Sequence, residues 1–90
     1  MLIVTYNLKG EATAYTSFYE ALKAQGVWWH CLPSTWLLVS SKTPKQVVED
    51  LRTHLLRGDH LFVGTLQHGY NGWLPKDAWE WIRTHGLNSR

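Results

Sequence analysis

Apolar side chains recur along this chain with two different spacings, and the changes between them predict its secondary structure. Residues 2–8 (LIVTYNL) are rich in β-branched and aromatic side chains and lead into a turn, which predicts a buried strand. Within residues 13–25 the apolar positions follow i, i+3, i+4 and i+7, the stripe of an amphipathic helix that ends before Gly26. The chain therefore begins with a strand followed by a helix.

The next segment is typical of two short strands joined by a tight turn. Residues 27–31 and 35–41 are largely apolar, and the Leu-Pro-Ser between them places a proline where no strand hydrogen bond is needed. A second helix is expected to start at Thr43, because this capping hydroxyl is followed by a proline and, three residues after the cap, by a glutamine. Gly58 is expected to close that helix.

Residues 59–66 return to strand character, and a proline-led segment at 75–85 predicts a short terminal helix that stops at Gly86. The order strand, helix, strand, strand, helix, strand predicts an α+β, ferredoxin-like βαββαβ fold, in which two helices cover one face of a four-stranded antiparallel sheet. Right-handed crossovers lead us to expect the first and fourth strands beside the third in the sheet interior. A chain of 90 residues has room for one such domain, residues 1–90.

Tryptophan is unusually frequent, with six in the chain and three of them between Gly26 and Val39. A buried tryptophan offers a large contact area but needs a partner for its indole N–H. The sheet face opposite the helices needs a cover, and a tryptophan-rich face suits association with a second copy of the chain. The residues expected at this homodimer interface are Trp28, Trp29, Trp36 and Trp81.

The composition, with 44% apolar residues, is that of a globular protein. The single cysteine, Cys31, excludes an internal disulfide and fits a reducing compartment. No apolar run approaches the ~20 residues that span a bilayer, and the first residues lack the basic leader of a secretory signal, so a cytoplasmic protein without membrane contact is expected. A net charge of +2 permits contact with phosphates without requiring it.

Several short motifs resemble one family. Residues 3–8 (IVTYNL), the Trp-Trp-His at 28–30, the Ser-Thr-Trp at 34–36 and the strand at 59–63 are similar to small proteins described as SinR-like. These are related in turn to the CRISPR-associated adaptation protein, the dimeric partner of the CRISPR integrase, and to virulence-associated protein D. The resemblance covers residues 1–66.

The resemblance implies a ferredoxin-like homodimer that contacts nucleic acid, with metal-dependent nuclease activity in some members. That activity is associated with an aspartate at the end of the first strand, where this chain has Asn7. A carboxylate is an anionic ligand for Mg²⁺, whereas an amide offers only a neutral carbonyl oxygen. No cofactor is therefore expected, and Mg²⁺ enters only if the protein is a nuclease.

Three residues are candidates for catalysis, each with a structural alternative. Asn7 suits a turn whose backbone it would satisfy, and Ser34 is an ordinary turn former without an identifiable acidic partner. His30 can serve as an acid or a base near neutral pH, or can donate a hydrogen bond across a dimer face. Asp59, just ahead of the last strand, is a candidate for capping or for a solvated position. The remaining histidines lack the paired spacing of a zinc site; they are His54, His60, His68 and His85.

Three functions therefore remain open. The first is a homodimeric nucleic-acid-associated protein without strong catalysis, which would hold the phosphate backbone through Lys9, Lys42, Lys45 and Arg52. The second is a metal-dependent endonuclease acting on RNA or DNA. The third is a toxin–antitoxin-like module whose tryptophan-rich face binds another protein.

Overall fold

A computed structural model describes residues 1–67 and 69–86. His68, considered above as a zinc ligand, lies outside the described residues. The elements follow the order β1 (Leu2–Asn7), the 3-10 helix η1 (Ala12–Tyr15), α1 (Thr16–Lys23), β2 (Val27–Leu32), β3 (Thr35–Val39), α2 (Pro44–Arg52), β4 (His60–Thr65) and α3 (Lys76–Thr84). The predicted α+β class, the four-stranded antiparallel sheet and the additional C-terminal helix are confirmed.

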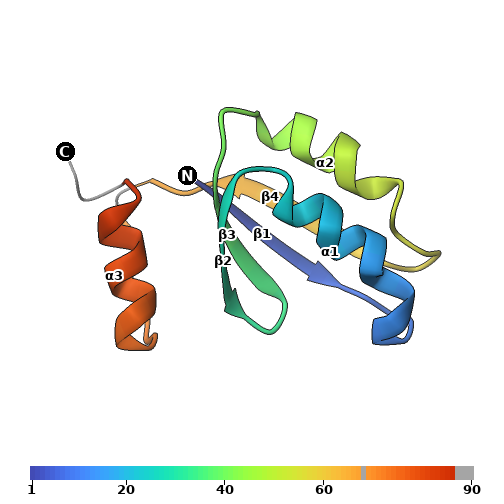
Figure 1. Cartoon of the computed structure of the whole chain (residues 1–90), viewed down its shortest axis with the longest axis horizontal. Coiled ribbons are helices and arrows are strands. Elements are labelled where there is room, and N and C mark those ends of the chain that lie inside the picture. The colour runs from blue at the N-terminus through green and yellow to red at the C-terminus, as the bar shows by residue number, and fades with distance from the viewer. Residues whose placement is uncertain (68, 87–90) are drawn as a thin grey trace.

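The four strands lie in the order β2-β3-β1-β4, and each neighbouring pair is antiparallel. Consequently β1 and β2 run parallel with β3 between them, and β3 and β4 run parallel with β1 between them. Helices α1 and α2 make these two connections and cover the same face of the sheet (Figure 1). β4 forms an edge of the sheet, so the expectation that it lies in the interior is wrong.

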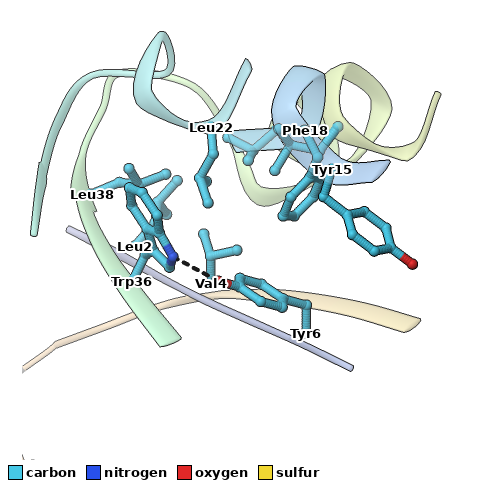
Figure 2. Close-up of a cluster of buried hydrophobic side chains, with 10 residues drawn as sticks. Leu2, Val4, Tyr6, Tyr15, Phe18, Leu22, Trp36 and Leu38 are labelled. Carbon is cyan, nitrogen blue, oxygen red and sulfur yellow. Dashed lines mark hydrogen bonds between the residues drawn. The ribbon is translucent and has the colours of Figure 1, made fainter. Parts of the chain in front are cut away.

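The core lies between this face of the sheet and helix α1 (Figure 2). Alternation along β1 points Leu2, Val4 and Tyr6 toward the helices, where they meet Phe18 and Leu22 of α1. β3 adds Trp36 and Leu38 from the neighbouring positions, and α2 adds Val47 and Leu51. Burial of these side chains fixes which face of each strand turns inward, and thereby positions the residues described below.

Helix α2 is shorter than expected, because it ends at Arg52 rather than at Gly58. Its start matches the prediction, since Thr43 and Gln46 form a reciprocal capping box. Beyond Arg52 the backbone tightens into i→i−3 bonds, and the Asp59 carboxylate accepts a hydrogen bond from the Leu56 N–H at 2.7 Å. These bonds turn the chain toward β4 before another helical turn can form.

Helix α3 packs against β2 on the opposite side of the sheet from α1 and α2 (Figure 1). Its Trp81 ring meets Trp29, with ring centroids 6.2 Å apart. Trp28 and Trp36, in contrast, lie on the helix-covered side of the sheet, and their ring centroids are 5.0 Å apart. The expected dimer residues therefore do not share one face, because adjacent strand residues point to opposite sides of a sheet.

Among residues 1–67 and 69–86, no helix is long and apolar enough to cross a membrane.

Candidate functional site

Two of the three candidate catalytic residues line one hollow at the carboxyl end of β1. Asn7 ends that strand, and Ser34 lies in the turn between β2 and β3. The turn is held beside β1 because the Tyr6 N–H donates to the Ser34 carbonyl at 3.2 Å. We call this space of about 230 Å³ the polar hollow; its lining also includes Gly10, Tyr15, Tyr19 and Pro33.

The third candidate, His30, lies in an adjoining space that we call the aromatic cleft. This cleft has a volume of about 290 Å³ and is lined by Tyr19, Lys23, Trp28, His30 and Trp36. Alternation along β2 places Trp28 and His30 on the same face, and the i, i+4 spacing of Tyr19 and Lys23 places both on one side of α1. Tyr19 lines both spaces, so the cleft and the hollow are neighbours.

The rings of the aromatic cleft are layered. His30 stacks on Trp36 with centroids 4.3 Å apart and planes 18° from parallel. The Tyr19 ring centroid lies 6.4 Å from that of Trp36 with planes 17° apart, whereas the Trp28 ring packs against Trp36 at a tilt of 46°. The Lys23 ammonium lies 5.5 Å from the centre of the Trp28 ring, within the range of a cation–π contact.

A chain of hydrogen bonds ties the two spaces together. The Trp36 indole donates to the Tyr6 hydroxyl at 2.9 Å, and that hydroxyl donates to the Pro33 carbonyl at 3.4 Å. A ring nitrogen of His30, Nε2, lies 3.1 Å from the same carbonyl and donates to it when it carries the proton. Burial raises the pKa of Tyr6 to about 12, so the hydroxyl keeps the proton that it donates. The hairpin tip is thus anchored to the core.

Asp59 joins the loop after β1 to the loop after α2. Its carboxylate accepts hydrogen bonds from the Tyr15 hydroxyl at 2.9 Å and from the Lys9 N–H at 2.7 Å, in addition to the bond from the Leu56 N–H. Desolvation acts to raise the pKa of Asp59, but the hydrogen bonds from the Lys9 and Leu56 N–H groups and from Tyr15 outweigh it and lower the pKa. Asp59 therefore holds the loop after β1 against the loop after α2, which corresponds to the capping alternative rather than the solvated one.

Of the four basic residues expected to contact nucleic acid, three lie on α2 or just before it, and the fourth, Lys9, lies in the loop after β1. Lys42 bonds Asp50 at 2.7 Å, and Arg52 lies 3.6 Å from Glu49, so two of the four charges are already paired with carboxylates. Lys45 is exposed on α2. Lys9 is exposed in the loop after β1, two residues after Asn7, and is the basic residue nearest in sequence to the polar hollow, although it is not among the residues that line it.

The donors around Asn7 do not fit a divalent cation. The residues that line the polar hollow offer amide, hydroxyl and backbone oxygens but no carboxylate, and the nearby Asp59 oxygens accept hydrogen bonds from three other groups. Among the described parts of the chain, no group of three or more His, Cys, Asp or Glu side chains is arranged to hold a metal ion.

Two contributors to the site were absent from the sequence-based expectations. Tyr19 belongs to the apolar stripe predicted within residues 13–25, and Lys23 follows it by four residues, so the helical period places both on one side of α1. The two-residue period of a strand also predicts that Trp28 and His30 point to one face of β2 and Trp29 to the other.

In comparisons with known proteins, neither a family model nor a curated protein nor a solved structure matches this chain.

Proposed function

We propose that this protein is a homodimeric nucleic-acid-associated protein that contacts the phosphate backbone at the polar hollow. One observation carries this proposal: Asn7 and Ser34 line one polar hollow at one end of the sheet, beside a cleft of aromatic rings, and the exposed Lys9 follows Asn7 by two residues in the same loop. Amides, hydroxyls and lysine ammonium groups are frequent partners of phosphate oxygens, and neighbouring rings are suited to bases. The resemblance to the CRISPR adaptation protein and its SinR-like relatives favours the same function.

We also propose that the fold belongs to the ferredoxin-like group. The two split units support this assignment: β1-α1-β2 encloses β3, and β3-α2-β4 encloses β1. The fold by itself supports many unrelated functions, so the argument for nucleic acid rests on the site.

The proposed dimer uses the outer face of the edge strand β4; on β1, the outward-facing Ile3 already lines a pocket with Trp79 and Ile82 of α3. Phe62 is 68% exposed on β4, over Gly64 and close to Ile3. An exposed phenylalanine on an edge strand is a costly feature in a monomer and a natural contact between two copies. Sedimentation velocity is expected to show a dimer that Phe62→Ser dissociates and Phe62→Leu retains. A wild-type monomer at all concentrations would contradict this part of the proposal.

Binding is tested with labelled duplex DNA, single-stranded DNA and single-stranded RNA at low and moderate salt. Salt-dependent retention is expected, because contacts to phosphates release counterions. Lys9→Gln should weaken binding and reduce the magnitude of the salt slope by about 0.7–0.9, the value of one phosphate contact. Lys76→Gln on α3, a side chain that is 89% exposed and away from the site, is the matched control. Failure to retain any of the three nucleic acids at low salt would overturn the proposal and favour a protein partner.

Cleavage of the bound strand is a second candidate, and the grouping of Asn7, Ser34 and His30 at one end of the sheet favours it. The same binding reactions, run with Mg²⁺, Mn²⁺ or a chelator, test for cleavage. A nuclease predicts cut products that disappear in folded Asn7→Ala or His30→Ala variants. Retention without cut products would leave a binding protein.

A further inference from the structure

We propose that the aromatic cleft binds one unpaired nucleobase, with Lys23 contacting the adjoining phosphate, so that the protein selects single-stranded over duplex nucleic acid. This inference rests on the proposed function and specifies its ligand. Five side chains line the aromatic cleft, and Tyr19 is the one among them that also lines the polar hollow.

The shape of the cleft suits a flat ring. Trp28 is 39% exposed at the edge strand β2; its ring packs against Trp36 at a tilt of 46° and leaves part of its surface open. His30, exposed and stacked on Trp36, forms a second wall whose plane is set by the Pro33 carbonyl. A base that enters the cleft can therefore stack on the open surface of Trp28 or of His30, whose positions are already ordered.

The size and polarity of the cleft favour a nucleotide over a larger apolar molecule. Its volume of about 290 Å³ lies at the lower limit of ~300 Å³ for small-molecule sites, which suits one base rather than several. The His30 ring nitrogens and the Lys23 ammonium provide polar groups at its rim. A hydrocarbon makes no use of these exposed polar groups, whereas a nucleotide can pair its phosphate with the Lys23 ammonium.

Lys23 is positioned for a phosphate rather than committed to a protein carboxylate. Its ammonium lies 4.0 Å from the Glu20 carboxylate, and both side chains are largely exposed, so this ion pair is weak. The same ammonium lies over the Trp28 ring at 5.5 Å. A base stacked at Trp28 would thus bring its phosphate close to a lysine that is ready to pair with it.

Only an unpaired base can enter this cleft. Bases within a duplex are stacked on both faces, and flipping one out costs a few kcal/mol. The aromatic cleft and the polar hollow adjoin through Tyr19, so one strand can place a base in the cleft and a phosphate at the hollow. A duplex could reach the hollow with its phosphates but would leave the cleft empty.

The test measures anisotropy of a labelled ten-nucleotide thymidine strand and of a ten-base-pair duplex. Trp28→Ala is expected to weaken binding of the strand by about 5- to 150-fold, the conversion of 1–3 kcal/mol per stacked base, and to leave the duplex unchanged. Trp28→Phe should restore most of the affinity because it keeps a ring. Trp73→Ala removes a fully exposed tryptophan from outside the cleft and serves as the control. Lys23→Gln should lower the magnitude of the salt slope by about 0.7.

The outcomes separate this inference from the function on which it rests. Strand binding that responds to Lys9→Gln but not to Trp28→Ala would overturn the inference and leave the proposed function standing. Equal affinities for strand and duplex would also overturn it. Absence of binding by both would overturn the two together. Free adenosine monophosphate is added as a competitor; if it binds as tightly as the strand, the cleft is a site for free nucleotides, and selection of single strands is refuted.

Discussion

The indole Nε1 of Trp36 donates a hydrogen bond of 2.9 Å to the hydroxyl of Tyr6, inside the core and between adjacent strands (Figure 2). Trp36 is 2% exposed and Tyr6 is 8% exposed, so water cannot readily replace either partner. This bond connects the helix-covered core to the hairpin tip, since the same Tyr6 hydroxyl reaches the Pro33 carbonyl. The geometry of the aromatic cleft therefore depends on a core contact.

Removal of the Tyr6 hydroxyl is expected to destabilise the fold. Tyr6→Phe leaves the buried Trp36 N–H without its acceptor, which costs about 1–3 kcal/mol. For a domain of this size, each 1 kcal/mol lowers the melting temperature by about 4–8 °C. Urea unfolding and thermal denaturation measure the loss, with Trp73→Phe at a fully exposed position as the control. Equal stabilities of the two variants would contradict the importance of the bond.

Alkaline pH should weaken the fold through the same residue. Burial raises the pKa of Tyr6 to about 12, while tyrosine in an unfolded chain titrates near 10. The folded state thus binds the proton more tightly, and its contribution to stability is fully present below about pH 10 and is lost as pH rises toward 12. Urea unfolding at pH 9, 10 and 11 should show a steeper loss in wild type than in Tyr6→Phe. Parallel pH profiles would contradict this assignment.

Much of this fold is predictable because its local signals agree with its packing. The capping box at Thr43 and the glycine after α1 mark helix ends that the structure retains. The early end of α2 could not be predicted, because it depends on Asp59 accepting a bond from Leu56. The site is harder to predict from the sequence, because the contact between Lys23 and Trp28 forms only once α1 has packed beside β2. The separation of Trp28 from Trp29, in contrast, follows from strand alternation alone.

Loss of the Asp59 charge is expected to loosen the loop that carries Lys9. Asp59→Asn replaces one acceptor oxygen by a donor amide, which cannot satisfy Tyr15 and both backbone N–H groups. The lowered pKa of Asp59 means that its stabilisation is present above the unfolded value of about 3.9 and is lost as pH falls through the lower folded value. Thermal unfolding between pH 2 and 7 should therefore show a flatter acid limb for Asp59→Asn.

The exposed Glu11→Gln variant is the control for Asp59. Its acid limb should match that of wild type. An Asp59→Asn profile that also matches wild type would show that this carboxylate does not hold the two loops together.

Gly26 is expected to tolerate no side chain. It joins α1 to β2, and a Cβ built there would overlap the backbone carbonyl oxygen of Val39 on the neighbouring strand. The Cβ is fixed to the backbone of residue 26 and the atom that it meets is a backbone oxygen, so neither can rotate away. Gly26→Ala must therefore shift the start of the β2–β3 pair and should lower the free energy of unfolding by about 2 kcal/mol or more. Gly72→Ala, where the added atom meets only side chains at 3.9–4.0 Å, is the matched control. Equal urea midpoints for the two variants would refute the close approach.

The contact between Trp81 and Trp29 is expected to hold α3 on the sheet. Apart from this pair, Trp81 stacks on His85 within its own chain segment, with centroids 4.4 Å apart. Trp81→Ala should therefore lower the free energy of unfolding by about 1–2 kcal/mol and expose residues 76–84 to hydrogen exchange, while amides of β1 and β3 stay protected. Trp73→Ala should change neither quantity. Retained protection of residues 76–84 in Trp81→Ala would show that Ala78 and Ile82, both buried, are sufficient to dock the helix.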